Sequence, residues 1–446
     1  MRLKVLLVAL AFLPALGACT MVRPGGEPGP RPPERATPTP PPEERPRPRD
    51  RPTPPAPVPD PLPREVRALW VVRTTLSHPD SIRRMVERAA RAGFNTLLVQ
   101  VRGRGDAYYR SRWEPRPRVV LEQGRAFDPL DLVIREAHGR GLGVHVWVNA
   151  HLVGGLGALP SDPLHLIRAR PDLLAVPREL ARELFHADPY APSYGEALLE
   201  YARRNRDRVE GIYTSPSHPE VQEHIYSVWM DLVETYPLDG LHFDYVRYPN
   251  PGFDYSRDAL ERFREWVSPR LSPVRRGELD EAYQADVLAW VEALPGPWAE
   301  FRRAQITELV ERIYHGVKKR RPDAVVSAAV FANAEDAYRS RFQDWRGWME
   351  RGILDAVAPM AYTADNDAFR DQVGTAVEAA GAHRVWAGIG VYRNTFRGTL
   401  DKIRIARELE ARGVVLFSYD WAVTEGPSDG ARSFLDRVGE AVFHRR

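Results

Sequence analysis

From residue 64 onward, short runs of consecutive apolar residues alternate with segments that repeat apolar residues at helical spacing. Runs of this length are typical of buried strands, and the segments between them are typical of amphipathic helices. The eight expected strands are Val66–Val72, Thr96–Val101, Val144–Asn149, Leu241–Val246, Ala324–Phe331, Ala356–Ala361, Val385–Val391 and Val414–Tyr419. The expected helices are Ser81–Ala92, Pro129–Arg140, 221–236, Trp298–Arg321, Asp344–Arg351, Asp367–Ala380, Leu400–Ala411 and a last one that ends near Val442.

This order of elements predicts an α/β fold, a (β/α)₈ barrel over residues 64–446. Strict alternation of strand and helix favours a parallel sheet, and eight units favour its closure. The strands are almost entirely apolar, as expected when both faces of a sheet are covered. The main alternative is a doubly wound open sheet. Such a sheet more often has a glycine-rich phosphate loop after its first strand, and Val71–Thr75 lacks one.

Two connections are unusually long, and both leave the carboxyl ends of expected strands. They span residues 150–219, after the third strand, and 249–297, after the fourth. Long connections inside a compact domain are usually functional or contain small elements of their own. We therefore expect these insertions to wall the mouth of the barrel and to shape an extended cleft.

The first residues carry a targeting signal. Arg2 and Lys4 precede an apolar run, Val5–Leu16, that is too short for a confident membrane span. The run ends in Leu16-Gly17-Ala18-Cys19, which resembles the lipobox of bacterial lipoproteins. We predict a signal peptide over 1–18, cleavage before Cys19, and a lipid anchor on Cys19 that attaches the protein to a membrane. The alternative is an ordinary signal peptide with an incidental cysteine.

Residue Thr20 supports a particular address for such a lipoprotein. It is not the aspartate that often retains lipoproteins at the inner membrane. We therefore expect a cell-envelope protein, anchored in the outer membrane and facing the periplasm if the organism is Gram-negative. Cys19 is the only cysteine of the chain, so an internal disulfide is excluded.

Residues 19–63 are expected to form a disordered tether behind the lipidated cysteine. They are dominated by Pro, Arg, Glu and Thr and contain almost no large apolar side chains, so they cannot bury enough surface to fold. Proline-rich chains extend by roughly 3.1 Å per residue, which gives a reach on the order of 100 Å. Such a tether would hold the folded part away from its membrane.

Composition and missing motifs exclude several classes of function. A net charge of +3 over 446 residues does not indicate a nucleic-acid-binding protein. The first strand has no His-x-His pair, and the chain has no cysteine cluster or His-Glu-x-x-His helix, so we predict neither a required metal nor another cofactor. A Gly-x-Ser-x-Gly nucleophile motif is also missing.

The most informative stretch is Asp239–Tyr248, which reads Asp-Gly-Leu-His-Phe-Asp-Tyr-Val-Arg-Tyr. It places Asp244 at the end of the fourth strand, the edge where such barrels carry their chemistry. A carboxylate among aromatic rings and a guanidinium suits glycosidic bond cleavage, since the rings can stack on sugars. The alternative is that Asp244 is a loop or capping carboxylate. Alternation places His242 one layer beneath it, as a sugar contact or as a hydrogen-bonded core residue.

Glycosidic cleavage needs a second carboxyl group. Glu335, after the fifth strand, is our first choice for the general acid, and Asp336, Asp365 and Asp420 are alternatives that could equally be loop or capping residues. In the turn after the second strand, Arg102 and Asp106 could pair and orient substrate hydroxyls, or the turn could satisfy itself. The full set of expected substrate contacts is Arg102, Asp106, Trp147, Asn149, His242, Tyr245, Arg247, Tyr248, Tyr362 and Asp420.

The order of these motifs resembles glycosyl hydrolase-like family 10, bacterial envelope proteins often built as lipoproteins. The matching segments are Val66–Trp70, Gly93–Thr96, Gln100–Arg102, Gly105–Tyr109, Phe127–Leu130, Glu136–His138, His145–Asn149, Asp239–Tyr245, Tyr248–Pro249 and Pro359–Tyr362. The resemblance implies a (β/α)₈ glycoside hydrolase fold distantly similar to the alpha-amylase clan. In that clan an aspartate that ends strand four is the nucleophile and a glutamate near the end of strand five is the acid, which implies these roles for Asp244 and Glu335.

For the substrate, the resemblance implies bacterial cell-wall glycan, that is, peptidoglycan strands. The leading hypothesis is therefore a lipid-anchored glycoside hydrolase of envelope glycans. Two alternatives stay open: a non-catalytic carbohydrate-binding lipoprotein on a glycosidase fold, and a hydrolase of secreted exopolysaccharide. A deacetylase is disfavoured, because its metal ligands are missing.

Overall fold

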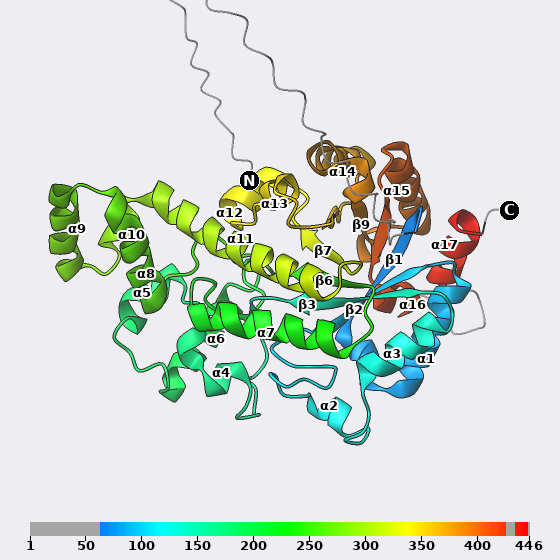
Figure 1. Cartoon of the computed structure of the whole chain (residues 1–446), viewed down its shortest axis with the longest axis horizontal. Helices are drawn as coiled ribbons and strands as arrows, with labels where there is room; N and C mark the ends of the chain where they lie inside the picture. The colour runs from blue at the N-terminus through cyan, green and yellow to red at the C-terminus, as the bar shows by residue number, and fades with distance from the viewer. Residues whose placement is uncertain (1–62, 425–432, 445–446) are drawn as a thin grey trace, which may run out of the picture. The chain divides into compact units, whose positions relative to one another are not determined.

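The computed structural model describes residues 63–424 and 433–444 (Figure 1). Eight parallel strands form one sheet, in the order β8-β7-β6-β3-β2-β1-β10-β9. Their bounds are β1 Val66–Val71, β2 Thr96–Arg102, β3 Gly143–Asn149, β6 Gly240–Asp244, β7 Val325–Val330, β8 Ala356–Pro359, β9 Trp386–Gly390 and β10 Gly413–Phe417. The expected signal peptide, Cys19 and residues 20–62 lie outside the described residues.

The sheet curls into a nearly closed barrel. The first and last barrel strands along the chain, β1 and β10, are neighbours inside the sheet. They pair from Val66↔Gly413 to Trp70↔Phe417. The two edge strands, β8 and β9, are joined by the parallel bridges Val357↔Val385 and Met360↔Gly388. The predicted (β/α)₈ fold is therefore confirmed, and the open doubly wound sheet is excluded.

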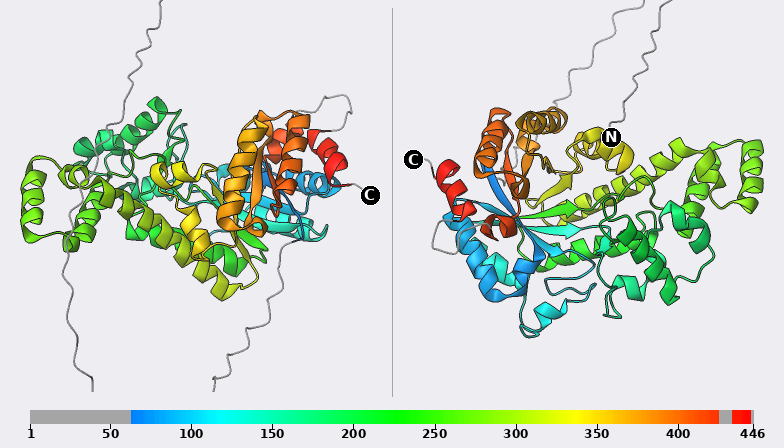
Figure 2. Two further views of the ribbon diagram at one scale, coloured as in Figure 1. Left: turned by 90° about the horizontal axis from the view of Figure 1, so that it is seen from above. Right: turned by 180° about the vertical axis from the view of Figure 1, so that it is seen from behind.

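Helices cover the outside of the barrel, as the alternation predicts (Figure 2). The helices between or after the barrel strands are α1 Pro79–Arg91, α3 Pro129–His138, α7 Pro219–Thr235, α11 Pro295–Arg320, α13 Trp345–Glu350, α14 Asn366–Ala380, α15 Phe396–Glu408 and α17 Phe434–Val442. Asp128 caps α3, because its side chain accepts a hydrogen bond from the backbone N–H of Asp131. The carboxylate of Asp344 caps α13 in the same way, at the backbone N–H of Gly347.

The inside of the barrel has its own apolar cluster. It is separate from the larger core between the sheet and the helices, and it includes Trp70, Trp147 and Trp386. Because side chains alternate between the two faces of a strand, each barrel strand contributes to both cores, which explains why the strands are almost entirely apolar in sequence.

The two long insertions contain small elements of their own. The first holds an antiparallel pair, β4 Leu152–Gly154 with β5 Ile212–Tyr213, and the helices α4 Leu166–Ala169, α5 Arg178–Leu184 and α6 Pro192–Arg204. The second holds α8 Arg257–Val267, α9 Pro273–Ala285 and α10 Ala289–Ala293. These last helices lie beside the start of α11 (Figure 1). They share with it a separate apolar cluster around Phe263 and Trp298. Three further short helices are α2 Arg118–Leu121, α12 Ala334–Ser340 and α16 Tyr419–Thr424.

Within the described ranges, none of the helices combines the length and the apolar character that crossing a bilayer requires.

Candidate functional site

Asp244 is the last residue of β6, the fourth barrel strand, and its side chain is held by three donors. Oδ1 accepts the backbone N–H of Tyr245 at 2.7 Å and Nη1 of Arg247 at 3.2 Å. Oδ2 accepts the indole N–H of Trp147 at 3.1 Å. The residue is 7% exposed. Burial raises the pKa of Asp244, and Arg247 and the other donors offset only part of this rise.

The strand ends at Asp244, two residues earlier than expected, because the backbone turns at Tyr245. Tyr245 has a φ of 49°, in the left-handed region that residues other than glycine rarely adopt. The turn is fixed from the neighbouring chain, since the N–H of Ala150 donates to the carbonyl of Asp244 at 2.7 Å and the N–H of His151 to that of Tyr245 at 3.2 Å. Strain of this kind persists where the surroundings enforce it, and it often marks functional sites.

Arg247 connects Asp244 to a second carboxylate, that of Glu210. Its Nη1 donates to Asp244, and its Nη2 lies 3.8 Å from Oε1 of Glu210. The other oxygen of Glu210 accepts the hydroxyl of Tyr213 at 2.6 Å. The guanidinium also lies 4.0 Å from the ring centre of Tyr245. Asp244 and Glu210 therefore both lie next to the guanidinium group of Arg247.

Sequence reasoning missed Glu210. It lies just before β5 in the first long insertion, which was expected to wall the mouth of the barrel, but no local motif distinguishes it from the other acidic residues there. Its proximity to Asp244 arises from the folding of a connection of about seventy residues. The length of a connection does not predict how it folds.

Trp147 and Asn149 hold the floor of the site. The indole N–H of Trp147 also reaches Oδ1 of Asn149, at 2.8 Å, and the amide of Asn149 donates to the carbonyl of Gly103 at 2.9 Å. Gln100 extends the network, because its Nε2 lies 3.4 Å from Oδ1 of Asn149 and its Oε1 accepts Nη1 of Arg73 at 3.1 Å. Trp147 and Asn149, both predicted to contact the substrate, are buried beside Asp244. There they hold the carboxylate of Asp244 and the turn at Gly103.

Asp106 lies at the far end of this network, and it does not pair with Arg102. Its Oδ1 accepts the backbone N–H groups of Gly103 and Arg104, and its Oδ2 lies 3.9 Å from Nε of Arg73. Arg102 instead forms a buried ion pair with Glu114, with Nη2 and Oε1 2.6 Å apart. It has no solvent exposure, so it is not placed to contact a sugar directly.

A group of aromatic side chains borders the other side of the site. Tyr362 stacks on Phe417 with ring centres 5.4 Å apart, and it meets Trp70 and Tyr392 edge-on. Burial raises the pKa of Tyr362 well above its usual range, and the negative charge of Asp244 adds to the rise. At the rim, Tyr392 and Trp421 are 38% and 48% exposed, with ring centres 6.0 Å apart. These two rings are accessible for stacking on a sugar.

Two predicted sugar contacts are core residues instead. His242 is fully buried: its Nε2 accepts the indole N–H of Trp70 at 3.1 Å, and its Nδ1 lies 2.9 Å from the Ser327 hydroxyl. Burial lowers the pKa of His242 to about 3, so it is neutral at ordinary pH. Tyr248 is also buried, and its ring packs edge-on against Phe342.

The structure does not bring Glu335 to Asp244. Glu335 lies in the first turn of α12, where the backbone N–H is capped by Asn333. Its side chain is 54% exposed and forms ion pairs with Arg339 and, at 3.4 Å, with Arg346. Nothing in this environment suits a general acid facing Asp244.

Asp420 connects the segments that follow two neighbouring barrel strands, β10 and β1. Its carboxylate accepts the backbone N–H of Val72 at 3.0 Å and the hydroxyl of Thr75. It therefore links the start of α16, after β10, to the segment that follows β1. This contact positions the loop that carries Arg73.

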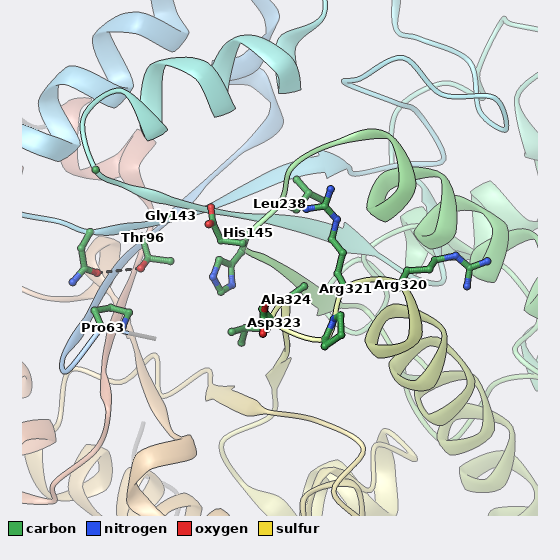
Figure 3. A pocket seen from close by; sticks show the side chains of 14 residues that line it. Pro63, Thr96, Gly143, His145, Leu238, Arg320, Arg321, Asp323 and Ala324 are labelled. Atoms are coloured by element: carbon green, nitrogen blue, oxygen red, sulfur yellow. Dashed lines mark hydrogen bonds between the residues drawn. The ribbon is translucent and has the colours of Figure 1, made fainter. Parts of the chain in front are cut away.

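A separate cavity of about 620 Å³ opens at the opposite end of the barrel (Figure 3). It lies at the amino ends of the strands, between Pro63, Thr96, His145 and the chain around Arg321. Burial lowers the pKa of His145 to about 4, and its Nδ1 has no hydrogen-bond partner among the described residues. Because barrel enzymes carry their chemistry at the carboxyl ends of the strands, this cavity is not the candidate active site.

Among residues 63–424 and 433–444, no group of three or more His, Cys, Asp or Glu side chains is arranged to hold a metal ion.

A nearly closed (β/α)₈ barrel with a carboxylate at the end of its fourth strand, held by an arginine and a tryptophan, is an arrangement that suits a glycoside hydrolase-like protein. The family model described as "Glycosyl hydrolase-like 10" matches residues 65–196 and 200–392, so the chain belongs to this family. The resemblance seen in the motifs is confirmed.

Two curated relatives have names that agree with this class. Over 314 residues the chain is 26% identical to the glycosyl hydrolase DigH of Escherichia coli O6:H1, covering 64% of this chain and 60% of the relative. Over 333 residues it is 23% identical to the glycosyl hydrolase YngK of Bacillus subtilis, covering 67% of this chain and 54% of the relative. The match therefore spans little more than half the length of these relatives.

A solved structure with a similar fold is the PgaB (BpsB) glycoside hydrolase domain from Bordetella bronchiseptica. The TM-score is 0.56 at 16% identity, covering 80% of this chain and 94% of the domain. Identity this low supports the fold alone.

Proposed function

We propose that this protein is a lipid-anchored glycoside hydrolase that cleaves glycosidic bonds in bacterial cell-envelope glycans, with peptidoglycan glycan strands as the substrate. The observation that carries the proposal is Asp244, a buried carboxylate at the carboxyl end of the fourth barrel strand, fixed by Trp147 and Arg247. The family membership and the names of the relatives support hydrolysis of a glycan. The lipobox and the proline-rich tether support the envelope address.

In this proposal Asp244 acts as the nucleophile or as the carboxylate that stabilises the developing positive charge on the sugar. Trp147, Arg247 and the N–H of Tyr245 aim its oxygens, and Asn149 fixes the indole of Trp147. Tyr392 and Trp421 offer their rings to a neighbouring sugar unit.

We assign Glu210, in place of Glu335, as the candidate proton donor. It is the carboxylate that shares Arg247 with Asp244, and its side chain is 38% exposed, so a bound glycan can reach it. Its hydrogen bond from Tyr213 fixes one oxygen and leaves the other directed at the Arg247 side of the site.

The test is turnover of purified, peptide-free glycan strands by residues 64–446, measured as new reducing ends. We expect Asp244→Asn to lower turnover by more than about a thousandfold, since removing a reacting group typically costs at least that much. We expect Glu210→Gln to lower it strongly and Glu335→Gln to leave it unchanged. Undiminished product release by Asp244→Asn would remove Asp244 from the mechanism.

A second candidate function is glycan binding without cleavage. It is favoured by one observation: Arg247 lies between Glu210 and Asp244, so the two carboxylates do not face each other directly. This candidate predicts saturable binding of the same strands with no new reducing ends. Secreted exopolysaccharide would be identified as the substrate by turnover of such a polymer and not of wall glycan.

A further inference from the structure

The cavity at the amino ends of the strands is an unfilled end of the barrel interior. Thr96, His145 and Val325 line it from β2, β3 and β7. Val325 belongs to the inner apolar cluster, and His145 lies two residues before Trp147, another member, so both side chains face inward. The interior of an eight-stranded barrel is normally filled by side chains. Here the inward position of β6 is Gly240, which leaves the end open.

His145 is the buried polar group of this cavity. It is 3% exposed, and its ring meets Trp386 edge-on with ring centres 5.6 Å apart. The ring occupies the room that Gly240 leaves, since a Cβ at residue 240 would be 2.4 Å from Nδ1 of His145. Figure 3 shows the ring directed into the cavity. A buried nitrogen without a hydrogen bond costs free energy, and a donor on a ligand can recover this cost.

Two carboxylates accompany the imidazole in the cavity lining. Oδ2 of Asp239 accepts the backbone N–H of Val144 at 2.7 Å and lies 2.8 Å from Nε2 of His138, whereas Oδ1 makes no hydrogen bond within the described part of the chain. Asp323 is exposed and forms neither a hydrogen bond nor an ion pair with any described residue. The lining therefore has carboxylate oxygens available for a ligand.

The two arginines of the lining are held by α7. Nε of Arg320 lies 2.5 Å from Oε1 of Glu234, and Nε of Arg321 donates to the carbonyl of Val233 at 2.9 Å. In Figure 3 both side chains run away from His145. The space next to His145 is therefore bordered by a carboxylate and an imidazole, with the positive charges at its rim.

The charge state of His145 decides which kind of ligand fits this space. Burial lowers the pKa of His145 to about 4, and the negative charge of Asp239 opposes this effect only in part. At ordinary pH the imidazole is therefore neutral and has one nitrogen that accepts a hydrogen bond. A ligand that donates to this nitrogen and also carries a positive charge would satisfy both the imidazole and the carboxylate. Guanidinium and primary ammonium groups have this combination of several N–H donors and one charge.

We propose that the cavity at the amino ends of the strands is a second binding site, which takes an alkylguanidinium or alkylammonium group. The group donates to His145 and to Oδ1 of Asp239, and Asp323 contributes a further negative charge at the entrance. This site is at the opposite end of the barrel from Asp244. It is therefore independent of the proposed hydrolase function, and failure of either proposal leaves the other intact.

The test is calorimetric titration of the chain from residue 19 onward, with Cys19→Ala so that no lipid is attached. The probes are butylguanidinium, butylammonium and butylurea, which is the neutral isostere of butylguanidinium. We expect saturable binding of the two cations and at least tenfold weaker binding of butylurea, since hydrogen bonds to charged groups are worth roughly twice as much as neutral ones. Binding of the cations should also weaken as the salt concentration rises.

Variants locate the binding in this cavity. Asp323→Asn should weaken binding of butylguanidinium by about two- to fivefold, as for a pair of exposed charges. His145→Phe keeps a ring and removes the acceptor, and it should weaken binding roughly tenfold. The matched control is Asp207→Asn, because Asp207 is also exposed and without a partner among the described residues but does not line the cavity. This change should leave the affinity as it is.

If His145→Phe does not fold, nitrogen NMR of the wild-type imidazole gives the same information. Butylguanidinium should shift the ring nitrogen resonances of His145, and butylurea should not. Unshifted resonances, together with an unchanged affinity in Asp323→Asn, would overturn the proposal, because the cation would then bind elsewhere. Equal binding of butylurea and butylguanidinium would overturn it as well, and so would binding of inorganic phosphate in place of the cations, which would assign the cavity to Arg320 and Arg321.

A final titration separates two sources of the cation. The peptide acetyl-Ala-Arg-Ala-amide presents the guanidinium on a chain, whereas butylguanidinium presents it on a small molecule. Binding of the peptide as tightly as butylguanidinium would support the site and assign it to an arginine side chain of another polypeptide. Binding of butylguanidinium alone would support the site and assign it to a free small cation.

Discussion

Nη1 of Arg247 lies 3.2 Å from Oδ1 of Asp244, and both side chains are almost completely buried at the end of the fourth barrel strand. The guanidinium therefore opposes the effect of burial, which by itself raises the pKa of the carboxyl group. Arg247 therefore favours the ionised form of Asp244, in addition to orienting it.

We predict that Arg247→Met shifts the acid limb of the pH profile of kcat/KM to higher pH. A nucleophilic Asp244 must be deprotonated, and loss of the nearby positive charge raises its pKa further. A charge at this distance is typically worth about 1–3 pH units. The profile of Arg118→Met, a change at an exposed arginine, should coincide with that of the wild type. An unshifted acid limb in Arg247→Met would show that Asp244 does not control it.

We predict that Trp147→Phe lowers kcat/KM on glycan strands by roughly 10- to 100-fold, because it removes a donor to a charged carboxylate while retaining a ring at this position. Within the described residues, the same change leaves Oδ1 of Asn149 with only the long contact from Gln100. The pH profile separates the two effects: loss of a donor to Asp244 should also shift the acid limb upward. A lower rate with an unshifted limb would indicate a packing defect alone.

We predict that the rim aromatics affect binding more than chemistry. Tyr392→Ala and Trp421→Ala each remove a ring that is exposed at the mouth of the barrel. Each should raise KM by a few-fold, since an aromatic contact is worth about 0.5–1.5 kcal/mol, with little change in kcat. Trp113→Ala is a suitable control, because Trp113 is equally exposed but lines a different cavity, next to Leu164 and His224. A fall in kcat at unchanged KM would contradict a role in sugar stacking.

The sequence predicts the barrel well because its signal is local. The apolar runs locate all eight barrel strands to within a few residues, and the position of Asp244 at a strand end follows from the same pattern. Even there the strand stops early, because Tyr245 adopts a left-handed conformation that no residue preference indicates.

The rest of the site depends on contacts between distant segments. Glu210 approaches Asp244 only through Arg247 and the folded first insertion. Arg102 pairs with Glu114, although Asp106 is nearer to it in the sequence. Several acidic residues follow strand ends in the sequence, and only the packing of the loops decides which one faces the site. Glu335 follows the fifth strand in the sequence, but its place in the first turn of α12 directs it to surface arginines.

The buried pair of Arg102 and Glu114 allows a prediction about stability that is independent of activity. Burial alone would raise the pKa of Glu114, but the contacts with Arg102 and His224 outweigh burial and hold this pKa below its usual range. A carboxyl group whose pKa is lower in the folded state contributes stability above its unfolded pKa, about 4.3, and loses this contribution as the pH falls below it.

Glu114→Gln should therefore be less stable than the wild type at pH 7, by about 3–5 kcal/mol, because it leaves Arg102 buried without an opposite charge. Its unfolding free energy should also fall less steeply than that of the wild type between about pH 5 and pH 3, since it lacks the group that titrates there. Denaturant unfolding followed by circular dichroism at several pH values measures both effects, with Glu122→Gln, at the exposed pair of Arg118 and Glu122, as the matched control that should show neither. Parallel pH dependence in Glu114→Gln and the wild type would mean that this ion pair does not contribute to the acid sensitivity of the fold.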